Sequence, residues 1–167
     1  MLNSDIYHAV IHDARFSNDE DYFKFIGALL WLKNQGHCVC YAYTLIPGHA
    51  HLLFRVLDWD IERCMQALMD CCYGGGPVDY ESEEICDAGH FIQVFRYIHQ
   101  DAVREDLCGH PAEYSYSSWI NDYLTDKADP ICQTGPVIRR FGLEELHKAV
   151  NEMLPPDTDC IDFSPLE

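Results

Sequence analysis

The stretch Tyr41-Ala-Tyr-Thr-Leu-Ile-Pro-Gly-His-Ala-His-Leu-Leu-Phe-Arg55 predicts two β-strands joined at Pro47-Gly48. Because side chains alternate between the faces of a strand, His49 and His51 share one face, and the apolar residues that alternate with them share the other. Two neutral imidazoles side by side suit a divalent metal ion. A bare His-x-His also fits ordinary surface or core histidines, so the metal site depends on what the rest of the chain supplies.

The composition predicts one globular domain in a reducing compartment. The chain has 167 residues, and 28 acidic residues against 11 basic ones give it a net charge of −17. A generic nucleic-acid-binding surface is basic, so this balance argues against one. Nine cysteines form no Cys-x-x-Cys pair, which favours buried free thiols and a cytoplasmic location. The longest apolar run, residues 25–32, is too short to cross a bilayer, so we expect no membrane partner.

The predicted elements follow the order β-α-β-β-α-β-α. Strands are expected at residues 6–11, 37–46, 49–56 and 78–85. Helices are expected from a capping box at Ser17 to Gly36, from a cap at Asp58 or Asp60 to the glycines at 74–76, and after Asp87. Two short helical stretches, near residues 113–123 and 136–153, complete a domain over residues 1–153, followed by an acidic irregular tail at 154–167. This order predicts an α+β domain with a ferredoxin-like or RRM-like antiparallel sheet, helices packed on one face and a site on the other.

The helix after Asp87 has an apolar stripe and a polar stripe. The polar stripe consists of His90, Gln93, Tyr97, Gln100 and Asp101. Residues three and four apart are neighbours on a helix, so Gln100 and Asp101 lie one turn beyond Tyr97. Taken alone, Tyr97 also fits an amphipathic residue at the edge of the core.

Two segments, Ile46-Pro-Gly-His-Ala-His-Leu-Leu53 and Arg96-Tyr-Ile-His-Gln-Asp-Ala-Val-Arg104, together form a specific pattern. They resemble Met-Pro-Asn-His-Val-His-Leu-Leu and Arg-Tyr-Ile-His-Gln-Asn-Pro-Val-Arg of the HUH single-tyrosine transposases, and most closely the REP-associated tyrosine transposases of the IS200-like group. Shorter similarities run through nearly the whole chain, at Tyr7-His8, Asp19-Glu-Asp-Tyr22, Pro111-Ala-Glu-Tyr114, Val150-Asn-Glu-Met153 and Cys160-Ile-Asp162.

This resemblance implies an HUH-type domain that cleaves and rejoins single-stranded or hairpin DNA through a 5′-phosphotyrosine intermediate. Carried over by position, Tyr97 is the nucleophile, and His49, His51 and Asp101 hold Mg²⁺ or Mn²⁺. The remaining candidates are Gln100 and Gln93, as a further metal ligand or as residues lining the site, and Arg96 and Arg104, as phosphate-binding residues. REP-associated relatives look monomeric, so we expect a monomer rather than a homodimer.

The chain departs from this family at positions that bear on activity. Asp101 stands where relatives have asparagine or glutamine, and Asp79-Tyr-Glu-Ser-Glu83 stands where they have Arg-Tyr-Lys-Ser-Glu. Residues 71–77 are shorter than the basic, aromatic stretch of relatives. Two alternatives therefore stay open. One is a repurposed relative that no longer cuts DNA, and the other is a small module that binds Zn²⁺ with the two histidines and Cys38 or Cys40.

Overall fold

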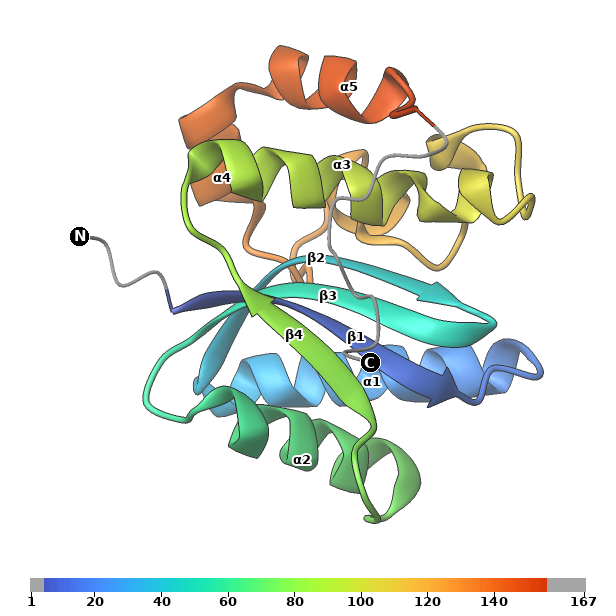
Figure 1. The fold of residues 1–167 in the computed structure, drawn as a ribbon, viewed down its shortest axis with the longest axis vertical. Coiled ribbons are helices and arrows are strands. Elements are labelled where there is room, and N and C mark those ends of the chain that lie inside the picture. The colour runs from blue at the N-terminus through green and yellow to red at the C-terminus, as the bar shows by residue number, and fades with distance from the viewer. Residues whose placement is uncertain (1–4, 156–167) are drawn as a thin grey trace, which may run out of the picture.

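A four-stranded antiparallel sheet forms the middle layer of the computed structural model, which describes residues 5–155 (Figure 1). Its strand order is β2 (Cys38–Ile46), β3 (Gly48–Val56), β1 (Ile6–Ala14) and β4 (Tyr80–Glu84). The predicted α+β fold class with an antiparallel sheet is confirmed. Residues 156–167, which hold most of the predicted tail and the Cys160-Ile-Asp162 similarity, lie outside the described residues.

Helices cover both faces of this sheet, whereas we expected them on one face only. In Figure 1, α1 (Asp19–Gln35) and α2 (Ile61–Tyr73) lie below the sheet, and α3 (Ala88–Arg104) lies above it. The reason is that β3 is apolar on both sides: the adjacent residues Leu52 and Leu53 point to opposite faces and are both buried. The third helix is needed to cover the face that carries the histidines.

The helix ends follow the predicted chemistry with one shift. Asn18, rather than Ser17, caps α1, since its Oδ1 accepts from the Asp21 N–H at 3.1 Å while Asp21 Oδ2 accepts from the Ser17 N–H at 2.8 Å. This is a reciprocal capping arrangement moved along by one residue. Gly36, at φ 77°, ends the helix as expected. Asp60 caps α2, and Asp87 caps α3.

The segments after α3 pack against one edge of the sheet and against the side of α3 that faces away from the sheet. The first predicted helical stretch contains only a 3-10 turn at Pro111–Glu113 and a π-type turn at Trp119–Tyr123. The second is broken at Gly142 into α4 (Thr134–Phe141) and α5 (Leu143–Asn151). Isolated bridges from Ser117 and Cys132 cover the outer edge of β2. Within residues 5–155, the outer edge of β2 is therefore covered at Cys40 and at Thr44.

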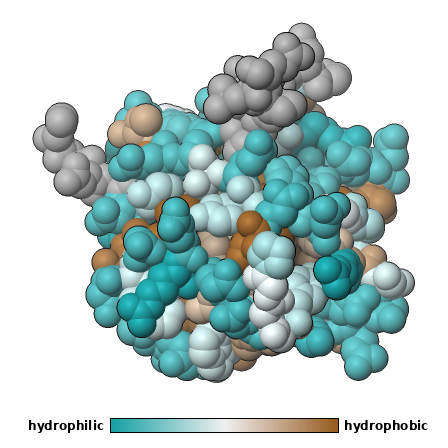
Figure 2. Space-filling view, turned by 60° about the horizontal axis from the view of Figure 1, so that its bottom comes forward, coloured by the Kyte–Doolittle hydropathy of each residue, from teal (hydrophilic) through white to brown (hydrophobic). Residues whose placement is uncertain are grey.

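The exterior reflects the acidic composition. Figure 2, which turns the lower side of Figure 1 forward, shows a mostly hydrophilic surface with small, separate apolar patches. Within residues 5–155, no helix combines the length and apolarity that crossing a membrane requires.

Candidate metal centre

The two histidines sit on an interior strand of the sheet. In β3, His51 lies opposite Val10 of β1 and Thr44 of β2, so hydrogen-bonded ladders on both sides hold its backbone. His49 lies two residues earlier, directly after Gly48, whose φ of 97° makes the tight turn from β2. His51 is buried, and His49 is partly exposed. The sheet therefore presents both imidazoles to α3 from a rigid base.

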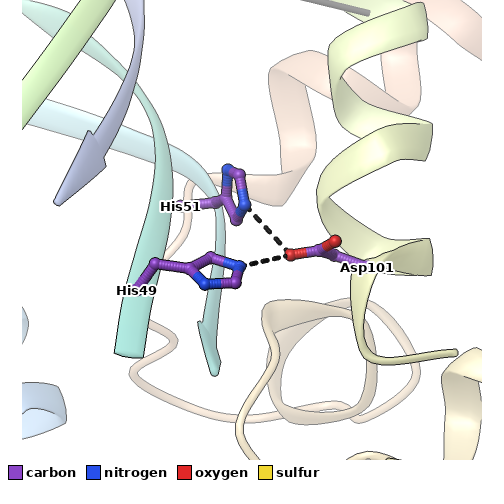
Figure 3. A group of neighbouring side chains, drawn as sticks. All are labelled: His49, His51 and Asp101. Carbon is purple, nitrogen blue, oxygen red and sulfur yellow. Dashed lines mark hydrogen bonds and ion pairs between the residues drawn. The ribbon is translucent and has the colours of Figure 1, made fainter. Parts of the chain in front are cut away.

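The third residue of the group comes from the last turns of α3. Figure 3 shows both imidazoles pointing at the carboxylate of Asp101. His49 Nε2 lies 2.9 Å and His51 Nε2 lies 3.0 Å from the same oxygen, Asp101 Oδ2. Asp101 itself is only 3% exposed. The structure thus brings together the three residues predicted to hold a metal ion, from segments about fifty positions apart in the chain.

The electrostatics keep Asp101 ionised. Burial on its own would raise the pKa of this carboxyl group, but the hydrogen bonds from His49 and His51 outweigh burial and hold the pKa well below its usual value. The same hydrogen bond raises the pKa of His49 against the opposing effect of burial. The group therefore combines a buried negative charge with two imidazoles that both contact the same carboxylate oxygen.

The spacing of these ligand atoms fits a divalent cation. All three lie within 4.8 Å of one another. Two ligands at right angles, each about 2.1 Å from an octahedral ion, are about 3.0 Å apart, which matches the two distances to Asp101. Two imidazole nitrogens and one carboxylate oxygen can hold a divalent metal ion, and the imidazoles favour a transition metal over Mg²⁺.

The zinc module with a cysteine ligand is contradicted by the structure. Cys38 and Cys40 line a small cavity together with Leu52 and Phe54, on the face of the sheet opposite to the histidines. This face packs against α1 and α2, so neither thiol can reach the imidazoles.

His51 has a partner that was not predicted from the sequence. His8, in β1, is fully buried, and its Nε2 lies 2.9 Å from His51 Nδ1. The two rings are stacked with centroids 5.2 Å apart. Burial lowers the pKa of His8 and keeps it neutral, so its Nε2 can accept a hydrogen bond from the His51 Nδ1–H when His51 Nε2 faces a metal ion. The sequence feature that could have predicted this partner is a histidine, His8, within the predicted strand at residues 6–11.

Tyr97 lies beside the group rather than in the core. Its ring centroid is 5.7 Å from that of His51, with an angle of 72° between the planes. The Arg104 guanidinium lies 3.9 Å over the Tyr97 ring, and its Nη2 donates to the Tyr97 carbonyl at 2.6 Å. The same nitrogen is 3.7 Å from Asp101 Oδ1. Arg104 therefore contacts both the predicted nucleophile and the predicted ligand.

Two other predicted site residues have structural partners instead. Gln100 is fully buried and donates to the Val150 carbonyl at 2.9 Å. Arg96 donates to the Ala149 and Glu152 carbonyls, both at 2.7 Å. Both side chains thus hold the end of α5 on the far side of α3. Gln93 is exposed two turns before Asp101, about 12 Å along the helix, which leaves it outside the ligand group.

An acidic strip, formed by Glu81 and Glu83 of β4, borders this face of the sheet. Residues paired across strands share a face, and Val10 pairs with both His51 and Glu81. Glu81 Oε2 is 3.1 Å from His12 Nε2, and Glu83 pairs with His90. Negative charge therefore adjoins the candidate metal centre at a position where the resembling family carries lysine.

The comparisons with known proteins address the fold. No protein-family model and no curated protein matches the sequence. One solved structure, of a REP-associated tyrosine transposase bound to a REP hairpin, is similar with a TM-score of 0.63 and 12% sequence identity. The similarity covers 75% of this chain and 90% of that one. The chain thus has the fold of a REP-associated tyrosine transposase, in agreement with the resemblance of its two motifs.

Proposed function

We propose that this chain is a metal-dependent transesterase that cleaves and rejoins single-stranded or hairpin DNA through Tyr97. The observation that carries the proposal is the convergence of two imidazoles and one carboxylate on a single point next to the Tyr97 ring. The fold supports it, because a protein of this fold has been solved bound to a REP hairpin. All of these residues come from one chain, so we propose that a monomer suffices.

His49, His51 and Asp101 would hold Mg²⁺ or Mn²⁺ in this proposal. A bound ion would draw negative charge from a phosphate oxygen, which otherwise repels a nucleophile. The other groups act on Tyr97 itself. Attack on phosphorus needs the phenolate, and a phenol has a reference pKa of about 10, so the proposed reaction requires a positive charge near Tyr97; the Arg104 guanidinium lies 3.9 Å over its ring.

The proposed reaction exchanges one phosphodiester for another. The Tyr97 oxygen bonds to the phosphorus, the bond from phosphorus to the 3′ oxygen breaks, and the 3′ end leaves as a hydroxyl group. The tyrosine ester keeps the bond energy, so a second 3′ hydroxyl can reverse the step and join a new end.

A repurposed protein that no longer cuts is the second candidate. The acidic strip favours it, because each phosphate contact that is lost weakens DNA binding and flattens its salt dependence. The net charge of −17 acts in the same direction at long range.

The test is formation of a covalent protein–DNA adduct. Wild-type protein is incubated with Mn²⁺ and end-labelled hairpin oligonucleotides at low salt, and the products are separated on a denaturing gel. Tyr97→Phe should abolish the adduct, while Tyr80→Phe, at a half-buried tyrosine of β4, should retain it. A wild-type protein that binds Mn²⁺ but gives no adduct with any of a varied set of hairpins would favour the repurposed alternative.

A further inference from the structure

A cavity of about 280 Å³ lies at the opposite end of α3 from the candidate metal centre. Every strand or its adjoining loop contributes to it, and α4 closes one side. The residues that matter are Tyr41, Arg55, Asp87, Phe91, Arg140 and Phe141. Phe91 precedes Asp101 by ten residues, or about 15 Å of helix, so this cavity is separate from the metal-ligating group.

The walls of the cavity are aromatic. Phe91 and Phe141 are stacked, with centroids 5.5 Å apart and an angle of 14° between their planes. Tyr41 meets Phe91 edge-on at 5.7 Å. Tyr41 and Phe91 are buried, and Phe141 is half-buried. Such walls offer a flat ring both stacking and edge contacts.

The rim of the cavity is cationic, in a chain that has few cations. Arg55 and Arg140 both line it and are exposed. Within residues 5–155, neither guanidinium has a carboxylate within ion-pair distance. The lining also holds one carboxylate, Asp87, which caps α3 because its Oδ1 accepts from the His90 N–H at 2.8 Å, so the lining carries two positive charges and one negative charge. Two arginines without acidic partners at an apolar cavity are complementary to an anion that carries a ring.

We propose that this cavity binds a small, flat aromatic molecule with one anionic group. The ring lies against Phe91, Phe141 and Tyr41, and the carboxylate or phosphate lies between Arg55 and Arg140. The volume is close to the lower end of the range for small-molecule sites, about 300 Å³, which suits one ring system and one anionic group. The site is independent of Tyr97 and of the metal ligands.

The test measures binding of matched probes to the full-length protein by isothermal titration calorimetry and NMR. The anionic probes are indole-3-carboxylate and adenosine 5′-monophosphate, and the neutral counterparts are indole-3-carboxamide and adenosine. Acetate and inorganic phosphate supply the anion without a ring. We expect at least one anionic aromatic probe to bind about tenfold or more tightly than its neutral counterpart and than its anion alone. A preference for one anionic probe over the other identifies the carboxylate or the phosphate as the anion.

Single variants locate the site. Arg55→Met and Arg140→Met should each weaken the anionic probe by about 10- to 100-fold. Arg139→Met is the matched control, since Arg139 is exposed on the same helix but does not line the cavity. Circular dichroism checks that each variant remains folded. Equal binding of neutral and anionic probes, or an equal loss in all three variants, would overturn the proposal.

One alternative occupant to be tested is part of the chain itself. Asp162-Phe163 joins an anion to an aromatic ring in the segment after residue 155. If the probes bind a Phe163→Ala variant but not the wild-type chain, then the tail occupies the cavity and the small-molecule proposal is wrong. If the two proteins bind the probes equally, the cavity is open to an external ligand.

Discussion

Replacing Asp101 with asparagine tests the centre of the proposed metal site. Asparagine keeps the shape of the side chain and one carbonyl oxygen but removes the negative charge. The carboxylate oxygen Asp101 Oδ2 lies 2.9 Å from His49 Nε2 and 3.0 Å from His51 Nε2, and Asp101 is only 3% exposed. Arg104 Nη2 also lies 3.7 Å from Asp101 Oδ1, so the effect on the ion is taken from the change in Tm with Mn²⁺ and not from Tm itself.

The expected magnitude follows from ligand linkage. At a Mn²⁺ concentration of 100 times Kd, binding stabilises the wild-type protein by about 2.7 kcal/mol. In a chain of this size, 1 kcal/mol corresponds to about 2–4 °C, so Tm should rise by roughly 5–11 °C. Removing even a second-layer partner of a metal ligand costs about 10- to 100-fold in affinity, so loss of the ligand's own charge should cost at least about tenfold. The Mn²⁺-induced rise in Tm should then fall to about half or less.

Thermal unfolding with a Mn²⁺ titration measures this difference. Asp106→Asn is the matched control, because it removes the same charge from an exposed residue near the end of α3. Asp106 has a φ of 56°, which asparagine tolerates. An equal Tm rise in wild type and Asp101→Asn would refute a contribution of the Asp101 charge to metal binding. A response lost equally in Asp106→Asn would show that only bulk charge matters.

Three further outcomes are expected. His8→Ala should weaken Mn²⁺ binding by about 10- to 100-fold, because His51 loses the partner that orients its ring; calorimetry measures this, and unchanged affinity would show that other contacts hold the ring. Burial lowers the pKa of His99 to about 3, so the stability that neutral His99 contributes is present above pH 6.5 and is lost as pH falls. The free energy of unfolding should therefore fall by about 1.4 kcal/mol per pH unit on this account between about pH 6 and pH 4, and urea unfolding of His99→Gln should lack that contribution. Arg104→Met should slow adduct formation about tenfold or more without weakening Mn²⁺ binding, because it removes a positive charge 3.7 Å from Asp101 Oδ1; a parallel loss of both would instead assign Arg104 to the metal site.

The part of the site that local periodicity fixes could be predicted from the sequence. The two-residue repeat of a strand puts His49 and His51 on one face, and the turn of a helix puts Asp101 beside Tyr97. Neither the strand periodicity nor the helix periodicity predicts that β3 and α3 are in contact. That step came from the resemblance of two motifs, and the contact between His49 and Asp101 agrees with it.

The part that depends on distant segments could not be predicted. Gln100, predicted as a further metal ligand or as a residue lining the site, lies on the side of α3 that binds the end of α5, fifty residues away in sequence. The role of His8 likewise depends on the pairing of β1 with β3, which places it one strand away from His51. In both cases the sequence shows a polar residue in a buried element but not the partner that satisfies it.

The acidic strip should affect DNA binding more than the chemical step. Glu81 is separated from His51 by β1, which places its strand about 10 Å away, and charges at that range are largely screened at physiological ionic strength. Glu81→Lys should therefore tighten hairpin binding and steepen its salt dependence by about 0.7 in the log–log slope, with little change in the rate of adduct formation at saturating DNA. Glu84→Lys, which adds the same charge on the opposite face of β4, is the control. A faster rate at saturation with unchanged affinity would mean that the strip acts on the reacting phosphate itself.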